Sequence, residues 1–274
     1  MSDGPDLIYR YDGSFKGLMC CVFESFYQRE TPLRVISHAE TQESLFEIRE
    51  VVTDNTKASR VMRAVVEKIS GEAMNLVYSA YLSDLKDKEL HILRFLRLGF
   101  KYGASVMRML TDDTVRILNK AVTHLSNEAA LLRGFVRFSD FGGGLVATIE
   151  PKNNVLPVIK HHFLSRYPDG CFIIYDKTHK LVLLAQQGRS RIIQVDDFVP
   201  PQAGNDELRY RTMWKRFYDT IAVEGRENPK CRMTHMPKRY WAHLTEMQTP
   251  PDTRPITDAP ARLTSNNTPA SGLR

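Results

Sequence analysis

Cysteine is scarce in this sequence, which has four cysteines in 274 residues and no CxxC spacing. Iron–sulfur clusters and structural zinc sites take several closely spaced thiolate or imidazole ligands, so a chain with this pattern does not carry such a centre alone. Adjacent cysteines such as Cys20 and Cys21 do not readily pair with each other. We therefore expect buried, reduced thiols in a cytoplasmic protein that has no metal site and no cofactor of its own.

Long apolar runs and several enzyme signatures are also missing. No run approaches the roughly 20 residues of a membrane-spanning helix, and Met1–Pro5 does not begin a secretory signal, so we expect no membrane association. The phosphate-binding pattern GxxxxGK[ST] and the nucleophile pattern GxSxG are absent, and no PCxxC follows His38-Ala-Glu40. These absences argue against P-loop nucleotidases, α/β-hydrolases and zinc deaminases.

The composition is that of a globular protein with a modest excess of positive charge. Hydrophobic residues make up 42% and charged residues 26% of the chain, and the net charge is +6. This excess favours an anionic partner without identifying one. Residues 248–274 hold five prolines, five threonines and few large apolar residues. We expect one globular domain over residues 1–247, followed by a disordered tail over residues 248–274.

The hydrophobic periodicity predicts an α+β fold. Alternating apolar residues indicate a strand at residues 7–11, and residues 33–52 favour a short strand, a loop and another strand. Apolar stripes at helical spacing predict a helical part over about 14–132, in which Ser14, Thr53-Asp54 and Thr111-Asp112 are candidate N-caps. A mainly antiparallel sheet is expected over about 133–197, and closing helices over about 206–247.

A basic, aromatic segment near the C-terminus is the strongest functional signal. Fixed cations beside flat rings suit DNA, because cations bind phosphates and ring faces stack on any base. The alternative is an ordinary helix that docks its two rings into the core and leaves its charges in water. The candidate DNA-binding residues are Arg226, Lys230, Arg232, Lys238, Arg239, Tyr240 and Trp241.

A second candidate group combines the expected strand at 134–139 with the helix that follows Asn154. Phe135 and Arg137 would share one face of that strand, and Arg133 lies just before it. On the helix, His162 and Arg166 are four residues apart and share a flank. Together with Arg137 they could hold a phosphate, and His162 is a weak candidate for a general acid–base. A hydrogen-bonded structural histidine is the competing interpretation.

Several phrases, taken together in order along residues 7–247, resemble the bacterial "probable DNA metabolism protein" family, which is also described as a DNA-repair family. These phrases are Tyr11–Leu18, Val52–Ala58, Leu98–Gly103, Gly134–Phe138, Asn154–Pro157, His162–Phe163, Ile173–Asp176, Trp214–Lys215, Asn228–Pro229 and Met236–Trp241. Members of this family are usually encoded beside a radical-SAM protein of DNA modification or repair. In some bacteria a similar domain is fused to a uracil-DNA-glycosylase-like domain.

The resemblance implies a DNA-repair accessory protein that binds DNA and works with a separate radical-SAM iron–sulfur protein. A uracil-DNA-glycosylase-like protein is a further partner that the fusions imply. The resemblance assigns no catalytic residue. Two other functions stay open: an enzyme that acts on a nucleotide or damaged base with His162, Arg137 and Arg166 around its pocket, and a structural adaptor whose basic surface binds an acidic protein.

Overall fold

The computed structural model describes residues 7–40, 46–196, 198–199, 204–221 and 228–248. It begins with a parallel sheet in the order β2-β1-β3, formed by β1 (Leu7–Tyr11), β2 (Arg34–Ser37) and β3 (Glu47–Glu50). Parallel neighbours need a crossover connection, and α1 (Phe15–Tyr27) supplies the one between β1 and β2. The sequence indicated these strands but not their parallel pairing.

Four α-helices follow the first sheet: α2 (Asn55–Lys68), α3 (Gly71–Leu82), α4 (Lys88–Tyr102) and α5 (Asp113–Phe135), with a short 3-10 helix, η1 (Gly103–Arg108), before α5. The predicted N-caps are confirmed. The side chains of Ser14, Asp54 and Asp112 accept backbone N–H groups of the first turns of α1, α2 and α5. Each cap satisfies donors that have no partner within the helix.

The second sheet has the order β4-β5-β6-β7-β8, and only the β5–β6 pair is parallel. Helix α6 (Leu156–Arg166) connects β5 to β6, as a parallel pair requires. The predicted α+β class and the mainly antiparallel pairing are therefore confirmed. The strands are β4 (Ser139–Asp140), β5 (Leu145–Ile149), β6 (Cys171–Asp176), β7 (Leu181–Gln186) and β8 (Arg189–Gln194).

The strand predicted at residues 134–139 is wrong except at its last residue, Ser139. Helix α5 continues to Phe135, and its backbone bonding ends where the N–H of Val136 donates to the carbonyl of Leu132. Only Ser139 and Asp140 pair with β5. Gly134 lies in the last turn of the helix. The helix tolerates it there, because a single glycine costs only about 1 kcal/mol relative to alanine. Arg133 and Arg137 consequently lie on a helix end and a connecting segment rather than on a sheet face.

The closing elements are α7 (Asn205–Ile221), α8 (Pro229–His235) and the 3-10 helices η3 (Lys238–His243) and η4 (Thr245–Met247). Residues 248–274, for which a disordered tail was predicted, lie outside the described residues apart from Gln248. Among the described helices, none combines the length and apolar character needed to cross a bilayer.

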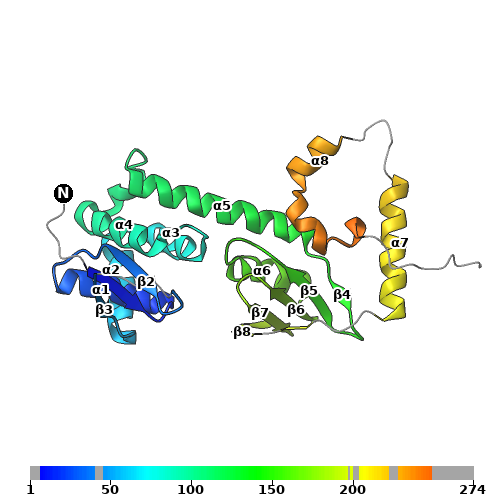
Figure 1. Ribbon diagram of the computed structural model, residues 1–274, viewed down its shortest axis with the longest axis horizontal. Helices are drawn as coiled ribbons and strands as arrows, with labels where there is room; N and C mark the ends of the chain where they lie inside the picture. The colour runs from blue at the N-terminus through cyan, green and yellow to red at the C-terminus, as the bar shows by residue number, and fades with distance from the viewer. Residues whose placement is uncertain (1–6, 41–45, 197, 200–203, 222–227, 249–274) are drawn as a thin grey trace, which may run out of the picture.

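Helix α5 joins two hydrophobic clusters. Figure 1 shows it running from a first group of elements, the first sheet with α1–α4, to a second group, the second sheet with α6 and the closing helices. Val115 and Leu118 pack in the cluster beneath the first sheet and α1–α4. About two to four turns after Leu118, Leu125, Ala129 and Leu132 pack with α6 and the second sheet. The α5 stripe thus supplies residues to both cores.

The expected burial of all four thiols holds for Cys20 and Cys21 but is wrong for Cys171 and Cys231, which are exposed.

The N-cap of α5 gives a test of this arrangement. Asp112 Oδ1 accepts the N–H groups of Thr114 at 2.9 Å and Val115 at 3.3 Å. We expect Asp112→Ala to lower the free energy of unfolding by about 0.5–2 kcal/mol, the usual cost of losing such a cap. The neighbouring Asp113→Ala is the control, because Asp113 makes an exposed ion pair with Arg116. Equal urea-unfolding midpoints for the two variants would contradict the assignment of Asp112 as the cap.

Candidate functional site

The basic, aromatic segment is only partly presented to solvent. Arg226 lies outside the described residues, whereas Lys230, Arg232 and Lys238 are exposed. Trp241 is half-buried and donates its indole N–H to the carbonyl of Met236 at 2.9 Å. The cationic groups of Arg232 and Lys238 lie 5.5 and 5.9 Å from its ring centre. The segment therefore has four exposed cations, because Arg239 is exposed as well, while its tryptophan is anchored to the protein.

Tyr240 does not form the stacking platform that the sequence suggested. Its side chain is 4% exposed and packs in the second core beside Phe135. Its hydroxyl bonds to Arg239 and to the buried Glu128. Arg239 also forms a 3.0 Å ion pair with Glu128. The competing interpretation, a helix that docks a ring into the core, is therefore the correct one for Tyr240, and Arg239 is held by an internal carboxylate.

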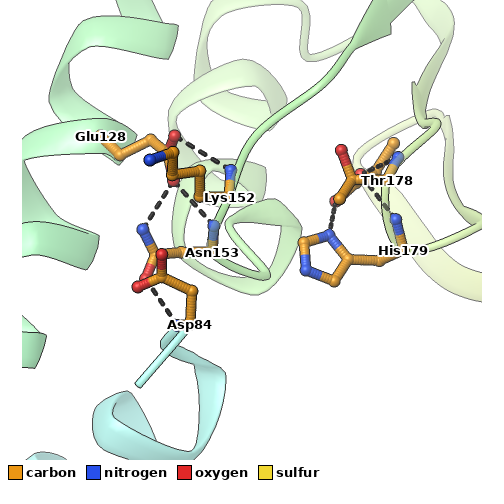
Figure 2. A network of polar contacts seen from close by, with 7 residues as sticks. Asp84, Glu128, Lys152, Asn153, Thr178 and His179 are labelled. Atoms are coloured by element: carbon orange, nitrogen blue, oxygen red, sulfur yellow. Dashed lines mark hydrogen bonds and ion pairs between the residues drawn. The ribbon is translucent and has the colours of Figure 1, made fainter. Parts of the chain in front are cut away.

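Glu128 is the centre of a buried polar network, most of which Figure 2 shows. The carboxylate is 3% exposed and accepts three bonds from the loop after β5. These come from the backbone N–H of Lys152 at 3.1 Å and from the backbone and side-chain N–H groups of Asn153 at 2.8 and 2.6 Å. Asn153 Oδ1 in turn accepts the backbone N–H of Asp84, just after α3, at 3.0 Å.

These bonds decide the charge state of Glu128. Burial works against ionisation, but the hydrogen bonds from Asn153 and Lys152 and the charge of Arg239 outweigh it and lower the pKa of Glu128. The network therefore contains a fixed carboxylate that needs all its donors. This makes Arg239 and Tyr240 positioning residues of the fold rather than free contacts for a ligand.

The predicted group of Arg137, His162 and Arg166 does not converge. The guanidinium of Arg137 pairs with the buried Glu246 at 2.7 Å and lines a groove to which neither His162 nor Arg166 contributes. His162 and Arg166 are exposed on α6, where the ring of His162 contacts Phe163 edge-on. The error follows from the misassigned strand, because Arg137 leaves the end of α5 towards η4 instead of lying on the sheet.

A different groove combines aromatic rings with unpaired cations. It lies between α1 and α2 beside the end of α4, and its volume is about 510 Å³. Tyr27 is 72% exposed, and its ring stacks on that of Phe23 at 6.0 Å between centroids. Phe26 is also exposed and meets Phe100 edge-on at 5.3 Å. The sequence signal was present in the stripe of α1, but the stripe alone did not show that its last turn is left uncovered.

The charge around these rings is positive. Arg60 and Lys68 line the groove and form no ion pair with any described residue, and the described lining contains no carboxylate. The guanidinium of Arg60 lies 5.9 Å from the centre of the Phe23 ring, and that of Arg97 lies 5.3 Å from the centre of the Phe26 ring. Rings flanked by cations can accept stacked bases and bind the adjoining phosphates. We name the face formed by Phe23, Phe26, Tyr27, Arg60 and Lys68 the α1–α2 groove.

The third feature is an apolar groove of about 550 Å³ between α7, the segment that joins α5 to β4, and η4. Tyr210, Met213 and Phe217 are exposed along it, and Trp214 stacks on Phe217 at 5.6 Å. The two arginines that line it are already paired, Arg137 with Glu246 and Arg211 with Glu207. This groove thus offers apolar surface but little free charge.

No three histidine, cysteine, aspartate or glutamate side chains of the described residues gather closely enough to hold an ion.

Comparison with known proteins yields a family but no activity. The model of a family described as a domain of unknown function, DUF4130, matches residues 86–246, more than half of the chain. No curated protein matches. Among solved structures, the chain is similar to a pGpG-specific phosphodiesterase, PggH, from Vibrio cholerae, with 8% identity, 65% of this chain and 81% of that chain covered, and a TM-score of 0.31. A likeness this weak carries no inference about fold or activity.

Acid titration tests the buried network. The pKa of Glu128 is lowered on folding, so its stabilising effect is present above the unfolded value of about 4.3 and is lost as the pH falls through the lower folded value. We expect Glu128→Gln to lose about 1.5–3 kcal/mol of unfolding free energy at pH 7, because hydrogen bonds to a charged group are removed. The difference from the wild type should shrink below about pH 4.

The matched control for this experiment is Glu67→Gln. Glu67 is exposed and makes only an i,i+4 contact of 3.9 Å with Arg63, so its replacement should leave stability almost unchanged. Urea unfolding at several pH values measures both variants. A Glu128→Gln variant as stable as Glu67→Gln at pH 7 would show that the network does not hold the fold together.

Proposed function

The chain belongs to the DUF4130 family, a domain of unknown function, and we propose that it is a DNA-metabolism accessory protein that binds single-stranded DNA in the α1–α2 groove. The observation that carries this proposal is the composition of the groove: four aromatic rings, two cations without ion pairs and no carboxylate among its described lining residues. Base stacking on exposed rings and phosphate contacts to cations are the two interactions that single-strand binding uses.

The groove suits a nucleic acid better than a protein surface. An apolar protein partner would cover the rings of the groove, but Arg60 and Lys68 would then be buried without counter-charges, which is costly. The phosphates of a nucleic acid neutralise both cations, while its bases cover the exposed faces of Tyr27 and Phe26. Lys230, Arg232 and Lys238, on the closing elements, are a second set of exposed cations that a longer strand could contact.

DNA repair and the radical-SAM partner are finer parts of the proposal. They rest on the resemblance of the sequence phrases to the DNA metabolism family, and the groove itself would accept any single-stranded nucleic acid. In this account the chain supplies binding and positioning, and the separate iron–sulfur protein supplies the radical chemistry. A cytoplasmic location is part of the same proposal.

Replacement of Tyr27 is the direct test of the groove. We expect Tyr27→Ala to weaken the binding of a single-stranded oligonucleotide by about 1–3 kcal/mol, the value of one stacked base, while the melting temperature stays unchanged because the ring is 72% exposed. Tyr210→Ala is the matched control, since Tyr210 is an exposed tyrosine on α7 that does not line the α1–α2 groove. Fluorescence anisotropy with a labelled oligonucleotide measures both affinities.

The salt dependence separates phosphate contacts from other contacts. If the groove neutralises two or three phosphates, the slope of log affinity against log salt should be roughly −1.5 to −2 for single strands. Arg60→Ala should reduce that slope by about 0.7. Equal losses for Tyr27→Ala and Tyr210→Ala, or binding that does not respond to salt, would refute the assignment of the groove.

A structural adaptor is the second candidate, and the apolar groove along α7 favours it. Its arginines are paired internally, so this face presents rings and methionine rather than charge, and it suits an apolar surface of a protein such as the radical-SAM partner. We expect Phe217→Ser to abolish co-purification with that protein and Tyr27→Ala to leave it intact. Retention of the partner by Phe217→Ser would exclude this face.

A further inference from the structure

A polar cavity of about 300 Å³ lies where the two groups of elements meet, and it shares no described lining residue with either groove. Tyr11 and Gly13 reach it from the end of β1, and Ser37 reaches it from the end of β2. Strands β1 and β2 are parallel, so their carboxyl ends open on the same side. In open α/β sheets, ligands bind outside the carboxyl ends of neighbouring parallel strands.

The floor of the cavity holds a buried carboxyl group. Glu89, in the first turn of α4, lines the cavity and is 9% exposed. Its Oε1 accepts the hydroxyl of Tyr11 at a long 3.3 Å, and no described arginine or lysine forms an ion pair with it. Burial raises the pKa of Glu89. A group of this kind can be protonated at a pH where exposed carboxyls are charged, and it then donates a hydrogen bond into the cavity.

Lys88 brings a partly desolvated ammonium to the same space. Its Nζ donates to the carbonyl of Ser83 at 3.1 Å and lies 5.3 Å from the centre of the Tyr81 ring. Both of these residues also line the cavity. Burial lowers the pKa of Lys88. The ammonium group of Lys88 has three N–H donors. One donates to the carbonyl of Ser83 and the group also faces the Tyr81 ring, so a donor remains for an anion.

His179 also lines the cavity, and a buried aspartate orients its ring. Its Nδ1 lies 2.7 Å from Oδ2 of Asp176, which is fully buried and whose Oδ1 accepts the backbone N–H groups of Thr178 and His179. Because a carboxylate only accepts, the proton of the neutral ring lies on Nδ1 and leaves Nε2 free. Figure 2 shows the ring of His179 extending towards the side on which Asn153 and Asp84 lie.

The rim of the cavity is fixed by the Glu128 network. Glu128 holds the loop at Lys152 and Asn153, and the next residue, Asn154, donates its backbone N–H to the carbonyl of Leu82 at 2.9 Å. Lys152 and Asn154 both line the cavity. The side-chain Oδ1 of Asn154 is buried and accepts no hydrogen bond from the described residues. A buried acceptor without a partner is costly, and a bound ligand or water could satisfy it.

We propose that this cavity, lined by Lys88, Glu89 and His179 at the carboxyl ends of β1 and β2, binds a small phosphate monoester no larger than a mononucleotide. The lining holds two cationic side chains, Lys88 and Lys152, and two carboxyl groups, Asp84 and Glu89. When Glu89 is protonated, Asp84 is the one negative charge among these four groups, and the net charge is positive. The ammonium of Lys88 and the protonated carboxyl of Glu89 donate to phosphate oxygens. Nε2 of His179 accepts a hydrogen bond from the P–OH group of a monoanionic phosphate.

The size of the cavity separates this ligand from a polymer. Ligand pockets for small molecules begin at about 300 Å³, the volume found here. A nucleic-acid strand would instead need an open face, such as the α1–α2 groove. The proposal is therefore independent of single-strand binding, and either can fail without the other.

Calorimetric titration with inorganic phosphate and with a nucleoside monophosphate tests the site on the full chain. We expect His179→Gln and Lys88→Met each to weaken binding by at least about tenfold, as the loss of a charge-assisted contact requires. His162→Gln and Lys86→Met are matched controls, since both residues are exposed and neither lines the cavity. The unphosphorylated nucleoside should bind at least about tenfold more weakly than its monophosphate.

The histidine tautomer provides a readout that a purely structural role would not change. Long-range ¹H–¹⁵N spectra should show the Nδ1–H tautomer for His179 in the free protein and a shift of its Nε2 resonance on addition of phosphate. Asp176→Asn should alter the tautomer and weaken phosphate binding together, in a protein that still melts cooperatively. No binding of either phosphate probe, or equal affinities for His179→Gln and His162→Gln, would overturn the proposal.

Discussion

The carboxylate of Glu128 is the constraint on which the meeting of the two groups of elements depends. It lies on α5, the helix that supplies side chains to both hydrophobic clusters, and it accepts hydrogen bonds from the loop after β5 and from the closing helix η3. Asn153 in turn accepts the backbone N–H of Asp84, just after α3, and so links the network to the first group of elements. An ionised group buried without these donors would cost several kcal/mol, so the segments must be held together. The cavity at the carboxyl ends of β1 and β2 is a consequence of that meeting.

Local features of this fold could be predicted because short-range chemistry determines them. Ser14, Asp54 and Asp112 cap their helices through side-chain bonds to residues two or three positions away. Strands β6, β7 and β8 follow from runs of apolar residues bounded by turns. The error at residues 134–138 has the same local origin. Gly134 and the aromatic residues around it favour a strand when read alone, but the stripe of α5 continues through Leu132 into the second core.

The candidate site was harder to predict because its members are distant in sequence. Arg239 and Tyr240 look like free binding residues until Glu128, more than a hundred positions earlier, is known to pair with them. Likewise, Glu89 and His179 share a cavity that no spacing rule links. The rings of Phe26 and Tyr27 belong to an apolar stripe, and only the arrangement of α2 and α4 shows that the last turn of α1 is left exposed. Exposure, unlike periodicity, depends on which elements pack together.

Hydrogen–deuterium exchange of the full chain with and without a single-stranded oligonucleotide tests the central claim most directly. The account predicts slower exchange on binding in the last turns of α1 and α2, around residues 22–27 and 60–68, because bases cover those rings and phosphates hold those cations. Protection that is confined to residues 228–241, with no change in α1 and α2, would contradict it and place the nucleic acid on the closing helices instead.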